Sequence, residues 1–218
     1  MEELKDKIRR LETPDESCVV YQLQNIMDYL VNNFQLCIKN GGKTVILDLL
    51  EIEAYYCNKH NFHDACVHGH FLQKGEKRFG KIYIHRYKRT NGDSPFIRGN
   101  NRAGMDLCLS LGDYALAFLI RNATVNDYKD NGSHPAKLVE KVFDELALNY
   151  EAERENLKKI KNIAQENIEK ALLSLENECV LKKRKEPLNH NFSETDFSER
   201  IGIGKGLKDA PLRLAINS

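Results

Sequence analysis

The sequence predicts one domain of the mixed α/β class, with a sheet in the middle of the chain and helices on either side. Its 218 residues are enough for one sizeable hydrophobic core. Apolar residues recur at helical spacing towards both ends, whereas strand-like apolar runs separated by turn residues fill the middle. The expected parts are N-terminal helices, a sheet core with site loops, a helical segment and closing strands, in the order 1–33, 34–134, 135–185 and 186–218.

Two helices open the predicted fold. In segment 2–10 and just beyond it, Leu4, Ile8 and Leu11 lie three or four residues apart among charged side chains. Segment 22–33 repeats this spacing with five apolar residues, namely Leu23, Ile26, Met27, Leu30 and Val31. Both patterns predict a helix with one face against a core.

The central strands begin with a hairpin. Segments 34–38 and 44–52 read as strands, because Asn40-Gly41-Gly42 between them supplies the positive φ values of a tight turn. Further strands are expected at 81–87, 105–111 and 116–121.

The C-terminal third is expected to be helical at first. Helical spacing extends from Pro135 to about Val180. The basic run 182–185 reads as a solvated loop. Segments 200–206 and 210–216 read as two short closing strands.

Composition restricts the function classes. The chain is 30% charged and has no apolar run near the roughly 20 residues of a membrane span. It shows no export signal, and its six scattered cysteines suit reduced thiols, so we expect a cytoplasmic protein.

The net charge bears on a nucleic-acid partner. Because the formal charge is only +1, such a partner requires a local basic patch on the protein. The candidates for contacts with a nucleic-acid backbone lie on the polar loop 88–102 and are Lys88, Arg89, Arg98 and Arg102.

The strongest indication of a site is the apolar strand pattern 45–56, which delivers Glu53 and Tyr55 into a polar loop, 57–70. That loop holds four of the seven histidines and two of the six cysteines. Arg121 lies in an apolar strand and, if buried, needs a carboxylate partner, for which Glu53 is the obvious candidate. A strand that ends in these residue types is typical of the wall of a site.

Metal binding is the alternative interpretation of the same loop. Cys57, His60, His63 and Cys66 offer sulfur and imidazole ligands for a tetrahedral zinc site. Glu53 beside such an ion would indicate a hydrolase that activates zinc-bound water. Structural zinc sites usually place their ligand pairs on two separate knuckles, so we favour a loop that binds no metal.

Four separated segments, in order, resemble the alkyladenine (3-methyladenine) DNA glycosylase family of the mammalian type. They are Glu51-Ile52-Glu53-Ala54-Tyr55, 104–111, 119–123, and 200–203 with 211–213. The resemblance implies a curved, mainly antiparallel sheet flanked by helices. It also implies a monomeric repair enzyme, without cofactor or metal, that hydrolyses the N-glycosidic bond of a damaged purine in double-stranded DNA. In a bacterium such an enzyme would be associated with the nucleoid.

The resemblance implies roles for three residues at the reacting bond. Glu53 activates water, Arg121 helps to hold that carboxylate and the water, and Tyr55 stacks on the flipped-out base. The chemistry is consistent with these roles, because a carboxylate both draws a proton from water and stabilises an oxocarbenium-like transition state. An extruded base also needs flat neighbours.

The resemblance is poorer around the base pocket. His68 best matches a histidine that contacts the base, and His85 stands where an aromatic closes the base sandwich. Ser110 replaces an Asn that screens out guanine, and Ala103 stands where a wedge tyrosine is expected. A non-catalytic nucleic-acid-binding relative is therefore a further alternative.

Overall fold

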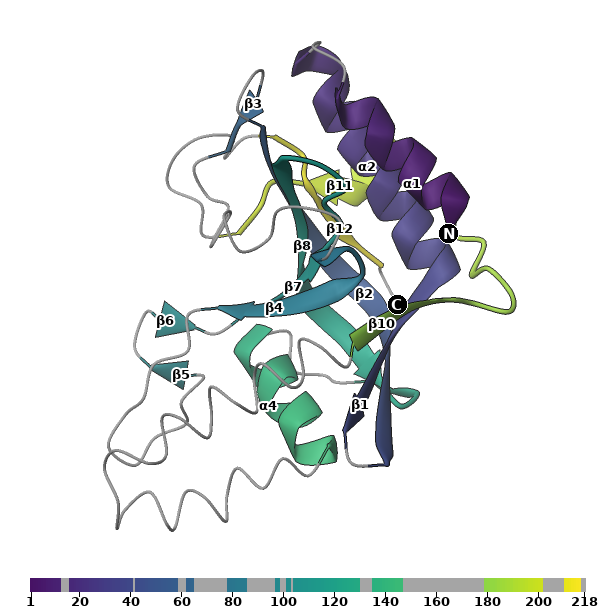
Figure 1. Ribbon diagram of the computed structural model, residues 1–218, viewed down its shortest axis with the longest axis vertical. Coiled ribbons are helices and arrows are strands. Elements are labelled where there is room, and N and C mark those ends of the chain that lie inside the picture. The colour runs from purple at the N-terminus through teal and green to yellow at the C-terminus, as the bar shows by residue number, and fades with distance from the viewer. Residues whose placement is uncertain are drawn as a thin grey trace.

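A computed structural model shows a mixed α/β fold with a curled antiparallel sheet and few helices (Figure 1). The structure describes residues 1–12, 16–40, 42–58, 62–64, 78–85, 97–98, 101–102, 104–129, 135–146, 179–201 and 210–216. The helices are α1 (Glu2–Arg9), α2 (Glu16–Asn33) and α4 (Pro135–Glu145), with 3-10 turns at Arg10–Glu12 and Glu194–Asp196.

Ten of the described strands belong to one sheet, and every pairing between them is antiparallel. They are β1 (Phe34–Asn40), β2 (Lys43–Asn58), β3 (Phe62–His63), β4 (Lys81–His85), β7 (Gly104–Cys108), β8 (Tyr114–Val125), β9 (Tyr128–Lys129), β10 (Cys179–Lys183), β11 (Phe197–Ser198) and β12 (Arg213–Ala215). The main path runs β10-β1-β2-β8-β7-β4, and β12 pairs with β2. The sheet curls until its ends approach, since Lys81 Nζ of β4 lies 3.4 Å from the Cys179 carbonyl of β10.

The ladder between β2 and β8 contains a register shift. The pairs around it are Leu49–Ala123, Glu51–Asn122 and Ile52–Ile120. Leu50 on one strand and Arg121 on the other are therefore skipped. Since side chains alternate along a strand, one extra residue exchanges the faces on which the following side chains lie.

The core shows this exchange directly. The buried core positions of β2 are Val45, Leu47 and Leu49 before the shift and Ile52, Ala54 and Tyr56 after it. Those of β8 change in the same way, from Tyr114, Leu116, Phe118 and Ile120 to Ala123 and Val125. Glu51, Glu53 and Tyr55 thus lie on the face opposite to this core.

The helices complete the core. Leu4 and Ile8 of α1 are fully buried, and the hydroxyl of Tyr56 on β2 donates to the Leu11 carbonyl at 3.0 Å. In Figure 1, α1 and α2 lie side by side, and α4 lies well apart from them. The α4 residues of the core are Ala136, Leu138, Val139 and Val142, followed by Leu146.

The prediction for segment 179–183 is wrong. This segment is strand β10, and not the end of a helix followed by a basic loop. Cys179 and Leu181 are buried, whereas Val180 and Lys182 are exposed, which is the alternation of a strand. The predicted basic loop therefore begins as a strand at the end of the sheet path, where lysines discourage pairing with other chains.

The closing strands also differ from the prediction. Of the strand expected at 200–206, Arg200 and Ile201 lie outside any strand and residues 202–206 lie outside the described part of the chain, whereas Phe197–Ser198 just before them forms β11. Within the predicted loop 88–102, Ile97–Arg98 (β5) pairs with Asn101–Arg102 (β6) in a separate small ribbon. Other elements have shifted ends, since α2 begins at Glu16 and β8 extends to Val125.

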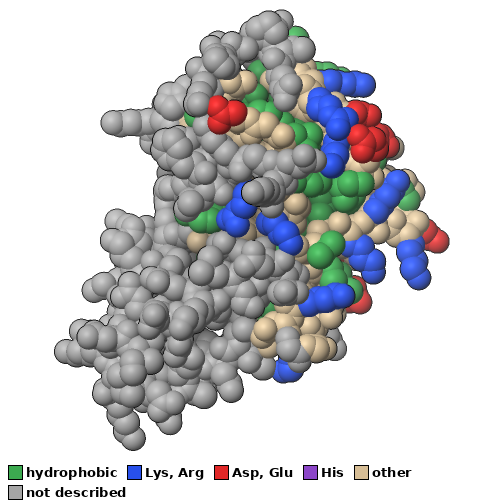
Figure 2. Space-filling model, in the orientation of Figure 1, with side chains coloured by type: hydrophobic (Ala, Val, Ile, Leu, Met, Phe, Trp, Pro, Cys, Tyr) green, Lys and Arg blue, Asp and Glu red, His purple; other side chains and the backbone are tan. Residues whose placement is uncertain are grey.

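No helix in the described part of the chain is long and apolar enough to cross a membrane. Figure 2 shows Lys and Arg side chains on the right of the view, where α1 lies in Figure 1, with Asp and Glu side chains among them. This mixture of signs agrees with the formal charge of +1.

Phe118 tests the core face of β8, because its side chain is fully buried. We expect Phe118→Ala to lower the free energy of unfolding by about 3–5 kcal/mol, through lost burial and the cavity left behind. Urea unfolding followed by circular dichroism measures this change. Tyr21→Ala is the control, because Tyr21 is 67% exposed. Equal effects of the two substitutions would contradict the assigned core.

Candidate functional site

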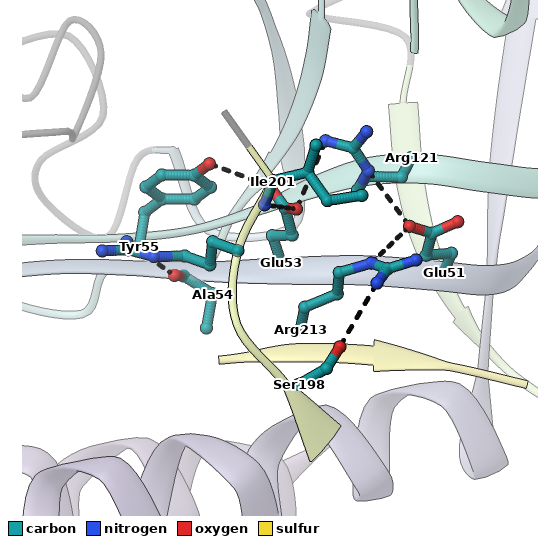
Figure 3. A network of polar contacts seen from close by, with 9 residues as sticks. Glu51, Glu53, Ala54, Tyr55, Arg121, Ser198, Ile201 and Arg213 are labelled. Atoms are coloured by element: carbon teal, nitrogen blue, oxygen red, sulfur yellow. Dashed lines mark hydrogen bonds and ion pairs between the residues drawn. The ribbon is translucent and has the colours of Figure 1, made fainter. Parts of the chain in front are cut away.

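A fully buried carboxylate, Glu53, lies at the centre of the candidate site (Figure 3). Its Oε1 accepts a hydrogen bond from the Ile201 backbone N–H at 2.8 Å and lies 3.2 Å from Arg121 Nη1. Its Oε2 accepts a hydrogen bond from the Tyr55 hydroxyl at 2.9 Å. These donors replace the water that a buried carboxylate loses.

Tyr55 is held from two directions. Its hydroxyl bonds to Glu53, and the Arg200 guanidinium carbon lies 4.7 Å from the centre of its ring, in a cation–π contact. Burial, and then the neighbouring charge of Glu53, raise the pKa of Tyr55 far above its ordinary value. Tyr55 therefore keeps its proton at neutral pH and acts as a hydrogen-bond donor to Glu53.

Arg200 is itself fixed by a buried ion pair. Its Nη1 lies 2.5 Å from Asp64 Oδ2 and donates to the Ala54 carbonyl at 3.2 Å. The side chains of Arg200 and Asp64 are both fully buried. This pair joins the segment before β12 to the end of the β2–β3 hairpin, and it supports the ring of Tyr55 from one side.

A second buried carboxylate, Glu51, continues the network. Its Oε1 lies 3.0 Å from Arg121 Nε and 2.7 Å from Arg213 Nε, and Arg213 also contacts the Ser198 hydroxyl at 3.3 Å. Arg121 therefore bridges two carboxylates, as Figure 3 shows. The pairing of Arg121 with Glu53 that the sequence predicts is present, and Glu51 shares it.

Sequence reasoning missed four members of this network: Glu51, Asp64, Arg200 and Arg213. Each had a signal. Glu51 stands two residues before Glu53, and both arginines lie in the segments that carry the family resemblance. What could not be read was the register shift that points Glu51 and Glu53 away from the core.

Of the predicted base-pocket residues other than Tyr55, only Ser110 has a described side chain. His68 lies outside the described residues, and for His85 only the backbone is described, opposite Gly104. The Ser110 hydroxyl accepts from the Leu116 N–H at 2.9 Å, so it holds the connection between β7 and β8. A role of Ser110 in base selection stays a prediction.

The DNA-backbone candidates lie mainly outside the description. Lys88 and Arg89 are not among the described residues, and only the backbones of Arg98 and Arg102 are, in the β5–β6 ribbon. Their contact with DNA stays a prediction.

The zinc alternative is also only partly visible. Cys57 and His63 are register partners in β2 and β3, whereas His60 and Cys66 lie outside the described residues. Within the described ranges, no three His, Cys, Asp or Glu residues gather in a way that could hold a metal ion.

The network suits activation of water. A carboxylate has about four acceptor positions, two on each oxygen. Within the described part of the chain, Oε1 of Glu53 faces two donors and Oε2 faces one. Among the described residues, this leaves an acceptor position on Oε2 beside Tyr55 for a water molecule.

Asp64 tests how far the site depends on its buried ion pair. We expect Asp64→Asn to lower the free energy of unfolding by about 3–5 kcal/mol, because it leaves the Arg200 charge buried beside a neutral amide. Urea unfolding measures this loss. Asp6→Asn is the control, since it removes the exposed pair with Arg9 and should have little effect. A tolerated Asp64→Asn would show that the pair does not hold the site together.

No protein-family model and no curated protein matches this chain.

Proposed function

We propose that this chain is a DNA glycosylase that flips a damaged purine out of double-stranded DNA and hydrolyses its N-glycosidic bond without a metal ion. The observation that carries the proposal is the convergence on Glu53. The Tyr55 hydroxyl and the Arg121 guanidinium both contact this buried carboxylate. These are the three residues for which the resemblance implies roles at the reacting bond.

Glu53 acts as the general base in this proposal. A water bound to Oε2 transfers a proton to the carboxylate as its oxygen attacks the anomeric carbon, and the base departs with the bonding electrons. The same negative charge stabilises the sugar as it becomes positive. Arg121 and the Ile201 N–H fix the orientation of the carboxylate through Oε1.

Tyr55 supplies the flat surface for the flipped base. Arg200 covers one face of its ring, so the base stacks on the other face. The curled antiparallel sheet is consistent with an alkyladenine-glycosylase-like fold. The proposed partner is duplex DNA with an alkylated or deaminated purine, bound by a single copy of the chain.

The central prediction concerns Glu53→Gln, which keeps the shape of the side chain but removes its charge. We expect excision of hypoxanthine, ethenoadenine or 7-methylguanine to slow by at least ~100-fold, the usual scale for a lost general base. Affinity for lesion DNA should stay within about tenfold, since phosphate contacts and stacking do not need this carboxylate. Single-turnover excision and a binding titration at one salt concentration measure both quantities.

Asp48→Asn is the matched control. Asp48 is a carboxylate on the same strand, and it pairs with Arg184 and accepts hydrogen bonds from Gln35 and Thr124. If the wild type binds DNA and excises none of the lesions, a non-catalytic relative is the better interpretation. If it neither binds nor excises, the proposal is wrong.

Tyr55→Phe separates stacking from hydrogen bonding. The variant keeps the aromatic ring but loses the 2.9 Å hydrogen bond to Glu53. We expect excision to slow roughly tenfold, as for a lost hydrogen bond to a charged group, with unchanged affinity for lesion DNA. Tyr55→Leu should weaken binding as well. Full activity of Tyr55→Phe would remove the hydroxyl from the mechanism.

A further inference from the structure

Glu51 is the most informative group outside the proposed chemical step. Its side chain is 11% exposed, yet its Oε1 accepts from two guanidinium groups, those of Arg121 and Arg213. Arg121 uses Nε for Glu51 and Nη1 for Glu53, so one guanidinium is shared between the two carboxylates. The orientation of Arg121 towards Glu53 is therefore set from its other side by Glu51.

We propose that Glu51 is a positioning residue that holds Arg121 in place and offsets its charge, so that the site favours a cationic sugar. This inference rests on the proposed glycosylase function. It assigns to Glu51 no contact with substrate, and its effect reaches the reacting atoms through Arg121 and Glu53.

The balance of charge supports this role. Glu51, Glu53, Arg121 and Arg213 carry two negative and two positive charges, all within one chain of contacts. Without Glu51 the two guanidinium charges would outweigh the single carboxylate next to the sugar. In a poorly hydrated site such an excess acts over several ångströms, and it would oppose the positive charge that forms as the base departs.

The geometry supports positioning as well as charge. A guanidinium presents its donors in a fixed plane, so two anchors on different edges define its orientation. Arg213, itself in contact with Ser198, keeps Glu51 from turning away. Glu51, Arg121 and Arg213 come from β2, β8 and β12, which are adjacent strands of one sheet.

The test uses two stable abasic-site analogues in otherwise identical duplexes. A pyrrolidine analogue is protonated and imitates the cationic sugar, whereas a tetrahydrofuran analogue has a similar shape and is neutral. The measured quantity is the ratio of the two dissociation constants at one salt concentration, because contributions from the phosphates cancel in it. No turnover is needed.

We expect the wild type to prefer the pyrrolidine duplex. Glu51→Gln should reduce this preference roughly tenfold or more, the scale of one uncompensated charge at several ångströms. Glu51→Asp keeps the charge and should recover part of the preference. Asp48→Asn removes an equivalent carboxylate–arginine pair on the same strand and should leave the ratio unchanged. Thermal unfolding of each variant identifies the temperature at which all are folded.

A second measurement identifies the route of the effect. In a double-mutant cycle on single-turnover excision, Glu51→Gln should have little additional effect once Arg121 is Gln, because the two residues act as a unit. Additive effects would overturn positioning through Arg121.

The outcomes separate the two proposals. If the wild type prefers the pyrrolidine duplex and Glu51→Gln preserves that preference, the role of Glu51 is wrong and the proposed function stands. If the wild type binds neither analogue better than undamaged DNA, the proposed function is wrong, and the role of Glu51 falls with it.

Discussion

The candidate site depends on the register shift between β2 and β8. The odd-numbered positions before it, such as Leu47 and Leu49, face the core, and an unbroken strand would send Glu51 and Glu53 in the same direction. Two carboxylates would then lie among aliphatic side chains, where desolvation is most costly. The shift turns them to the opposite face and gives Ile52 and Ala54 the core positions instead. It also skips Arg121 on the neighbouring strand, whose guanidinium contacts both carboxylates, so one local irregularity redirects Glu51 and Glu53 and brings a positive charge beside them.

Burial makes the polar network an interdependent unit. Glu53 has no exposed surface, and Arg121 and Glu51 have little, so each charge needs the others to replace its lost hydration. Removing one member leaves another buried and uncompensated. Such a network contributes little net stability compared with apolar packing, but it fixes the orientation of each group. Fixed orientation is what a general base and its stabilising donors require.

The C-terminal part of the chain completes the site from a great distance in sequence. Ile201 is 148 residues from Glu53, to which its N–H donates, and Arg213 is 162 residues from Glu51. These contacts form because β12 pairs with β2 along residues Glu51 to Glu53. The strand that carries the carboxylates is thus flanked by β8 on one side and by the closing segment on the other. Neither flank alone supplies all the donors that Glu53 accepts.

The sequence by itself determined the class of fold, the helices with one apolar face, the hairpin of β1 and β2, and the pairing of Arg121 with Glu53. These follow from periodicity, turn chemistry and residue type, which are local properties. Only the tertiary structure decided that segment 179–183 is a strand, because strand pairing with β1 outweighs a weak helical pattern. It also decided that Glu51 and Arg213 join Arg121, and that Asp64 and Arg200 support Tyr55. These partners are fixed by strand register and by contacts between distant segments, and no local pattern in the sequence encodes either.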